Sequence, residues 1–237
     1  MIVLTVYVVI EDKRDFTEFK QYKTAKKRLT FYKKWLTKSY VLVGLPAIVY
    51  ILLSENFSRL NNPFWTNSTI KYLHVEIVEK NPWVLIGGLT IGILVGWILQ
   101  GMITYKKTRW SNSEKTATIG DVQAILPKNA NERRYGFWLA LSAGINEELL
   151  FRVAIPLILL SLGLSPLATG VVSIVWFGCM HIYQGIFGVF GASLAGAGLL
   201  AMYIVTGSIL APIIFHASID LNALIIQPYI AKKSLRS

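Results

Sequence analysis

The chain has 237 residues, of which 54% are hydrophobic and only 16% are charged, and its mean hydropathy is +0.50. This composition is too apolar for an ordinary soluble domain and indicates a protein that crosses a membrane several times. The formal net charge is +11. Because 23 of the 24 Lys and Arg residues lie in the segments outside the apolar stretches, they do not indicate a nucleic-acid partner.

Six stretches are expected to be transmembrane helices, because about 20 predominantly apolar residues cross a hydrocarbon core of about 30 Å. The predicted fold class is therefore all-α, a polytopic transmembrane bundle of about six helices. The first expected span is the shortest. The expected spans are 39–54, 83–104, 136–160, 165–183, 186–206 and 208–228.

The distribution of basic residues predicts how these helices are oriented. Segment 11–38 holds ten Lys and Arg residues and segment 105–135 holds seven, whereas segment 55–82 holds three. Basic residues are retained on the cytoplasmic side of a membrane, so both termini and the 105–135 loop are expected in the cytoplasm. The first ten residues are apolar but lack a preceding basic region and a cleavage site, so they are not interpreted as a signal peptide.

Ionisable residues within the expected spans are few. Such groups are costly in a bilayer and usually face a bundle interior or a water-filled cavity, where they serve function. All of them lie in the last 100 positions of the chain, on three of the expected helices. They are Glu147, Glu148, Arg152, His181, His216 and Asp220.

The spacing of these residues predicts different roles for two adjacent carboxylates. Residues four apart share one face of a helix, so Glu148 is expected to pair with Arg152. Glu147 is turned by about 100° from Glu148 and is free to face a cavity. Pro156 removes the hydrogen bond to the carbonyl of Arg152, so a kink is expected beside this pair.

The same four-residue spacing relates Phe177 to His181 and His216 to Asp220. Carboxylates and imidazoles together suit water activation, with a Glu accepting a proton from water and a His stabilising an oxyanion. Peptide hydrolysis is the natural reaction. The chain has neither a His-Glu-x-x-His zinc motif nor a Gly-x-Ser-Gly loop, and Cys179 is two residues from His181, on nearly the opposite helix face.

Three short motifs resemble those of one known family. "EELLFR" (147–152), "FGCMH" (177–181) and "HASID" (216–220) resemble the EExxxR, FxxxH and HxxxN/D signatures of the CPBP family. That family includes the CAAX prenyl endopeptidases and bacterial proteins linked to bacteriocin processing and self-immunity. The resemblance covers about 136–228.

The resemblance implies roles for the residues of these motifs. It assigns water activation to Glu147 together with His181, and it places His216 and Asp220 on the oxyanion side, with Glu148, Arg152 and Phe177 in support. Asp220 replaces the asparagine form of the motif, and a charged aspartate would repel an oxyanion. It is expected either to be protonated or to orient His216.

The expected catalysis uses no cofactor, with zinc as the alternative, since two histidines and a glutamate could bind zinc and leave a position for water. The expected partners are the lipid bilayer and a peptide or lipidated-protein substrate, either a CAAX-type tail or a bacteriocin leader. The expected setting is a bacterial cell membrane. The expected organisation is a basic cytosolic segment at 1–38, two helices with loops at 39–135, a catalytic four-helix core at 136–228 and a cytosolic tail at 229–237.

Two other functions are compatible with a bundle of this kind. A non-catalytic immunity or scaffold protein would keep the fold and the ion pair but would not need Glu147, His181 and His216 together. A proton-coupled transporter would also bury Glu, His and Asp, but it should show inverted repeats with interrupted helices in both halves.

Overall fold

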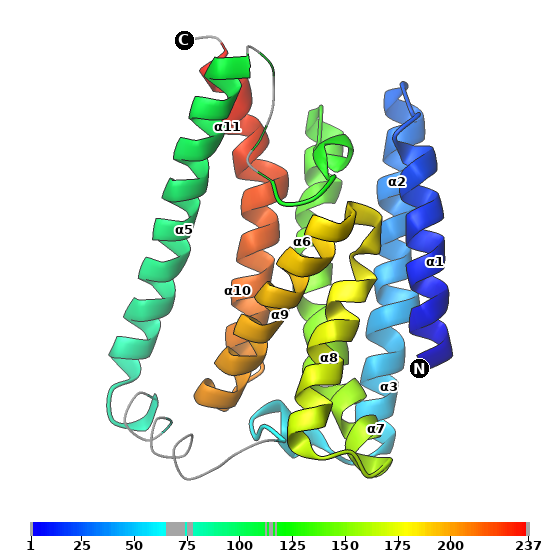
Figure 1. The fold of residues 1–237 in the computed structure, drawn as a ribbon, viewed down its shortest axis with the longest axis vertical. Coiled ribbons are helices and arrows are strands. Elements are labelled where there is room, and N and C mark those ends of the chain that lie inside the picture. Colours follow the sequence, from blue (N-terminus) through cyan, green and yellow to red (C-terminus); the bar gives the residue numbers. More distant parts are fainter. Residues whose placement is uncertain are drawn as a thin grey trace.

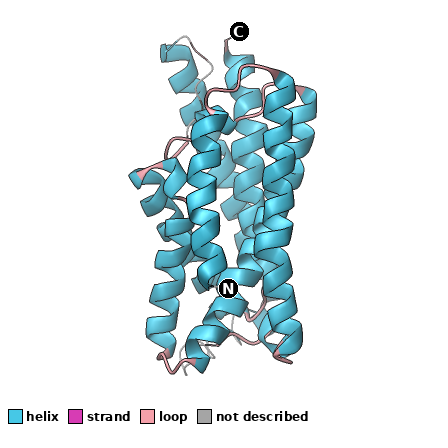
Figure 2. Ribbon diagram, turned by 90° about the vertical axis from the view of Figure 1, so that its right-hand side faces the viewer, coloured by secondary structure: helices cyan, strands magenta, loops and turns pink. Residues whose placement is uncertain are grey.

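The computed structural model describes residues 2–64, 74, 78–111, 113, 116 and 118–235. The regular structure of these residues is entirely helical, which confirms the all-α fold class. The helices run side by side along the long axis of the molecule (Figures 1 and 2). Parts of the expected loops 55–82 and 105–135 lie outside the described residues.

The main helices follow one another through the chain, and several continue into each other without a loop. A π-helical segment η1 (Ser39–Gly44) joins α2 to α3, η5 (Leu149–Ala154) joins α6 to α7, and η7 (Asn222–Ile226) joins α10 to α11. The α-helices are α1 (Ile2–Phe19), α2 (Ala25–Lys38), α3 (Leu45–Leu53), α5 (Pro82–Ser111), α6 (Ala130–Glu148), α7 (Ile155–Ser161), α8 (Pro166–Met180), α9 (Ile186–Thr206), α10 (Leu210–Leu221) and α11 (Gln227–Ser234).

Each π-helical segment ends two residues before a proline, at Pro46, Pro156 and Pro228. Proline has no backbone N–H, and its ring clashes with the carbonyl four residues earlier. A widened turn accommodates both effects without breaking the helix. The irregularity expected near Pro156 therefore takes the form of a π-helical turn, and that turn carries Arg152.

Among the residues that the structure describes, four helices are long and apolar enough to cross a membrane: Ala25–Leu53, Trp83–Ser111, Ile186–Thr206 and Leu210–Ser234. The expected spans 136–160 and 165–183 do not meet this combined requirement of helix length and hydropathy. The first lies in α6–η5–α7, which contains the charged residues, and the second corresponds to α8, with only 15 residues. Helix α6 packs along α10, and α8 packs along α9, so neighbouring helices rather than lipid cover part of their surfaces.

Within segment 1–38, expected as a basic cytosolic segment, helices α1 and α2 both contribute buried residues to the core, among them Phe16 and Tyr32. On α1, Asp15 accepts hydrogen bonds from Lys34 and Lys38 of α2 at 2.7 and 2.9 Å. The Phe19 ring stacks on Phe31, with 3.8 Å between centroids. These contacts place α1 against α8 and η1, where it becomes one wall of the site.

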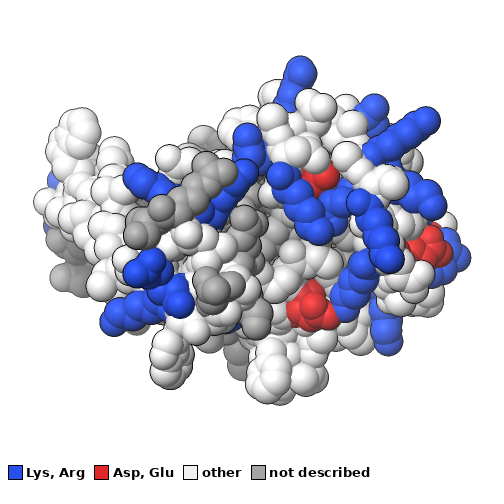
Figure 3. All heavy atoms as spheres, turned by 90° about the horizontal axis from the view of Figure 1, so that it is seen from above, with Lys and Arg blue, Asp and Glu red and all other residues white. Residues whose placement is uncertain are grey.

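One end of the bundle is strongly basic. Helices α2 and α6 begin there and α5 and α11 end there (Figure 1). Seen from that end, Lys and Arg side chains dominate the charged surface (Figure 3). We call it the basic end.

Candidate active site

A buried ion pair lies where α6 becomes π-helical. Arg152 Nε is 2.8 Å from Glu148 Oε2, and both side chains are fully buried. The guanidinium also lies over the ring of Phe177, 5.0 Å from its centroid. The pairing expected from the four-residue spacing is thus present, and Phe177 covers it.

Glu148 also contacts the second histidine. Its Oε1 accepts a hydrogen bond from His216 Nδ1 at 2.8 Å, so one carboxylate holds a residue of η5 and a residue of α10. Because Nδ1 is used in this way, the other ring nitrogen faces the remaining acids. His216 Nε2 is 3.8 Å from Asp220 Oδ2 and 4.0 Å from Glu147 Oε2.

Glu147 points away from this pair and into a cavity of about 700 Å³. Its Oε2 is buried and has no hydrogen-bond partner among the described residues. A buried carboxylate oxygen normally has such a partner, so this atom is placed to bind a water molecule or a substrate group. The divergence of the two adjacent glutamates follows the helical rotation expected from the sequence.

His181 lies at the C-terminal end of α8 and lines the same cavity. Its Nδ1 is 2.9 Å from the carbonyl oxygen of Phe177, which must be the acceptor, so Nε2 carries the free lone pair. The Phe177 ring lies 4.9 Å from the His181 ring and 5.7 Å from the His216 ring. Phe177 thus packs against both imidazoles.

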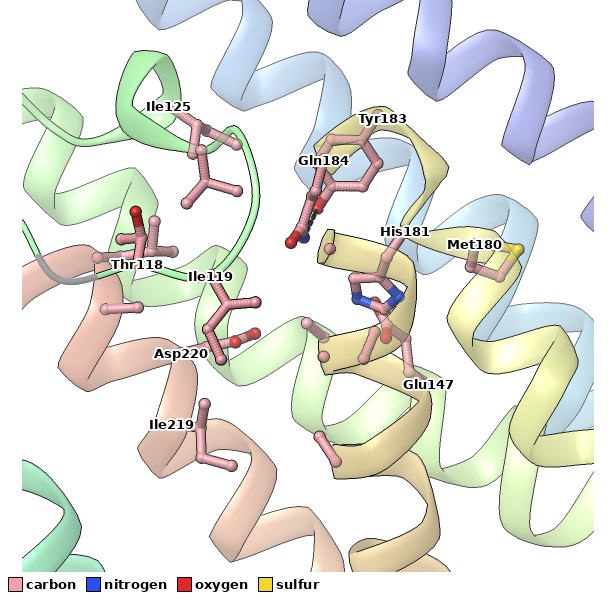
Figure 4. Close-up of a pocket in the computed structure, with 18 of the residues that line it drawn as sticks. Thr118, Ile119, Ile125, Glu147, Met180, His181, Tyr183, Gln184, Ile219 and Asp220 are labelled. Atoms are coloured by element: carbon pink, nitrogen blue, oxygen red, sulfur yellow. Dashed lines mark hydrogen bonds between the residues drawn. The ribbon is translucent and has the colours of Figure 1, made fainter. Parts of the chain in front are cut away.

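The structure brings the four expected catalytic residues to one cavity. Glu147 comes from α6, His181 from the end of α8, and His216 and Asp220 from α10. Glu147, His181 and Asp220 are visible together in Figure 4. Carboxylates and imidazoles that converge on one cavity can exchange protons with a water molecule and stabilise negative charge.

Sequence reasoning missed the part of the cavity wall that comes from the N-terminal half. Asp12, Trp35, Lys38 and Gln100 line it, from α1, α2 and α5. Lys38 Nζ lies 2.5 Å from Asp12 Oδ1. None of these residues belongs to a recognisable motif, and only tertiary contacts bring them to the site.

Sequence reasoning also missed a contact of Asn146, the residue that precedes the EELLFR motif. Asn146 is buried and donates a hydrogen bond from Nδ2 to Ser39 Oγ at 3.0 Å. A Cβ atom on Gly44 would lie 2.3 Å from Asn146 Oδ1, so only glycine allows this approach. The π-helical segment η1 is therefore seated directly against the residue before Glu147.

Zinc was the alternative to catalysis without a cofactor. Within the described part of the chain, no three His, Cys, Asp or Glu side chains are grouped so that they could hold a metal ion. His216 Nδ1 is held by Glu148 and His181 Nδ1 by a carbonyl, so Nε2 is the atom of each ring that could bind a metal ion.

Residues 131–222 match the family model described as type II CAAX prenyl endopeptidase Rce1-like. This segment is an Rce1-like domain. It begins in α6, ends at the first residue of η7 and contains all seven residues singled out from the motifs, in agreement with the CPBP resemblance. No curated protein and no solved structure matches the chain.

The Rce1-like match supports a relationship of this domain to CAAX-type intramembrane proteases. Together with the four apolar helices, it indicates an integral membrane protein. The match does not extend to bacteriocin processing or immunity, the other activities in the resemblance.

We expect Arg152→Met to lower the free energy of unfolding by about 3–5 kcal/mol, because it leaves the buried Glu148 carboxylate without its cation. Unfolding in detergent, followed by tryptophan fluorescence, measures this change. Lys34→Met is the matched control, since it removes a half-exposed partner of Asp15 and should cost no more than about 1 kcal/mol. Equal effects of the two substitutions would refute a structural role for the buried pair.

Proposed function

We propose that this protein is an intramembrane endopeptidase in which Glu147 activates the attacking water. The observation that carries the proposal is the unpartnered Glu147 Oε2 in a cavity shared with two histidines. Glu147 accepts a proton from water, and the hydroxide attacks the carbonyl carbon of the scissile peptide bond. The same proton is then delivered to the nitrogen of the leaving amine.

His181 acts beside Glu147 in this scheme. With its Nδ1 proton directed at the Phe177 carbonyl, Nε2 accepts a hydrogen bond from the attacking water and orients it. His216 acts on the opposite side of the reacting carbon. Glu148 holds its Nδ1, so a protonated Nε2 donates a hydrogen bond to the oxyanion.

Asp220 is assigned to the oxyanion side in its protonated form. Its Oδ2 is 3.8 Å from His216 Nε2, and Glu148 already orients that histidine. Of the two expectations for Asp220, donation of a hydrogen bond from a neutral carboxyl group is therefore the better supported. In that form it does what the asparagine of the family motif would do.

The proposed substrate is a peptide with a CAAX-type lipidated tail, as the description of the matched family suggests. Support comes from the mixed lining of the cavity. Ile103, Ile219 and Leu224 contribute apolar surface to the cavity, whereas Lys38 and Gln184 contribute polar groups. A bacteriocin leader peptide is the second substrate to test.

We expect Glu147→Gln to lower the rate of peptide cleavage by about 10²–10⁴-fold, the usual contribution of a general base. The purified protein is reconstituted in lipid and given prenylated and leader-type peptides, with and without a chelator. Glu18→Gln, on the exposed part of α1, is the control for loss of one carboxylate. Chelator-sensitive cleavage would replace the metal-free mechanism by a zinc mechanism. No cleavage of any peptide by wild type would favour a non-catalytic immunity or scaffold protein.

The role of Asp220 is tested by two substitutions that differ in hydrogen bonding. Asp220→Asn keeps a donor and should retain cleavage within about tenfold of wild type, whereas Asp220→Ala should lose about 10²–10³-fold, as removal of an oxyanion donor does. Initial rates on the same peptide measure both. Similar large losses in the two variants would mean that the carboxyl group itself is required.

We also propose that the basic end faces the cytoplasm, because basic residues are retained on that side. The test uses a Cys179→Ser background with a single cysteine at Lys232, at the basic end, or at Phe57, which is exposed beyond α3. In right-side-out vesicles, a membrane-impermeant maleimide should label Phe57→Cys and spare Lys232→Cys. The opposite labelling would invert the proposed orientation.

A further inference from the structure

A short segment between α5 and α6 lies over the candidate active site. We call residues 118–122 the strap. Thr118, Ile119 and Val122 line the same cavity as Glu147 and Asp220. Figure 4 shows Thr118 and Ile119 over the cavity on the side of Asp220. The strap therefore forms part of the cavity wall toward the basic end.

The strap is fastened to the turn that follows His181. The backbone N–H of Asp121 donates a hydrogen bond to the carbonyl of Gln184 at 2.7 Å, and Gln184 ends the short helix η6 (Ile182–Gln184). Gly120 has φ +79°, and a Cβ there would lie 2.8 Å from the same carbonyl oxygen. Glycine thus permits both the backbone conformation and the close approach.

The two ends of the strap are held by packing of Val122 against the buried cluster that contains Phe16 and by a hydrogen bond from Gln123 to Thr118 at 2.7 Å, whereas the fastenings of its middle are exposed. The Asp121 carboxylate pairs with Lys20, which directly follows α1, and both side chains are substantially exposed, at 57% and 40%. Ile119 rests on Gly191 of α9, yet 68% of its surface is exposed. Exposed ion pairs contribute little to stability, and segments with few buried contacts open most readily.

We propose that the strap is a gate at the basic-end mouth of the cavity, which lifts off α9 and the Gln184 turn to admit the substrate peptide. This proposal rests on the proposed protease function. Lifting breaks the Asp121 to Gln184 hydrogen bond and the Lys20 ion pair, and it withdraws Ile119 from the cavity. A peptide that arrives from the bilayer between helices would not need this movement, so the two routes can be separated.

A disulfide can hold the strap closed. A Cβ on Gly191 would lie 3.6 Å from Ile119 Cβ, within the roughly 3.5–4.5 Å range of Cβ separations in disulfides. We expect the oxidised double variant Ile119→Cys/Gly191→Cys, in a Cys179→Ser background, to lose peptide cleavage and to recover it with reductant. The two single-cysteine variants, oxidised in the same way, are the controls. Equal cleavage by the disulfide-linked and reduced forms would overturn the proposal.

A second measurement does not depend on cleavage. Ala195 lines the cavity, so Ala195→Cys in the Cys179→Ser background reports access by a water-soluble maleimide. Asp121→Asn and Lys20→Met, which remove the strap ion pair, should each speed labelling by about two- to five-fold. Glu11→Gln breaks another ion pair, with Arg14 on α1, that does not involve the strap, and it should leave the rate unchanged.

The labelling result separates failure of the gate from failure of the protease function. Labelling rates that are the same in Asp121→Asn, Lys20→Met and Glu11→Gln would overturn the gate even if wild type cleaves peptides. Faster labelling in the two strap variants would support the gate even if none of the peptides is cleaved.

Discussion

The structure of the site depends on the two contacts made by one buried carboxylate. Glu148 binds Arg152 on its own helix through Oε2 and His216 on α10 through Oε1. A charge buried in this way is tolerable only when it is paired and hydrogen-bonded. Because the carboxylate satisfies both partners at once, it fixes α10 against α6 and leaves His216 Nε2 directed at the cavity. Phe177, on α8, packs against Arg152 and His216 and so covers the same group of side chains.

These two contacts of Glu148 leave the adjacent Glu147 free to bind a water molecule or a substrate group. The cation and the nearer imidazole nitrogen are bound to Glu148, so Glu147 Oε2 keeps no hydrogen-bond partner among the described residues and has only the more distant His216 Nε2, at 4.0 Å. An unpartnered carboxylate is costly within a bundle of apolar helices. A water molecule or a reacting group would lower that cost, which links the chemistry of the site to the stability of the fold around it.

The local part of this site could be predicted from the sequence, and the tertiary part could not. The pairing of Glu148 with Arg152 follows from helix geometry alone, and so does the rotation of Glu147 away from that pair. The bond from Glu148 to His216 joins residues 68 positions apart, and helix periodicity carries no information about such a contact. The prediction of about six spans is compatible with the structure, although α8, an apolar helix of 15 residues that packs along α9, is shorter than the four helices long enough to span a membrane. The sequence places the wall residues Asp12 and Lys38 in a basic cytosolic segment, and charge counting cannot show that they pair with each other or line the cavity.

The cavity therefore combines two parts of the chain with different sequence character. The chemistry-bearing residues lie within 131–222, the segment that matches the Rce1-like family. Much of the opposite wall comes from α1, α2, α5 and the strap, all outside that segment. A substrate side chain that extends from the scissile bond toward Lys38 or Ile119 would meet these outer walls rather than the catalytic residues. Selectivity for a substrate can consequently change through the N-terminal half and the strap without altering the contacts of Glu148, which hold the reactive groups in place.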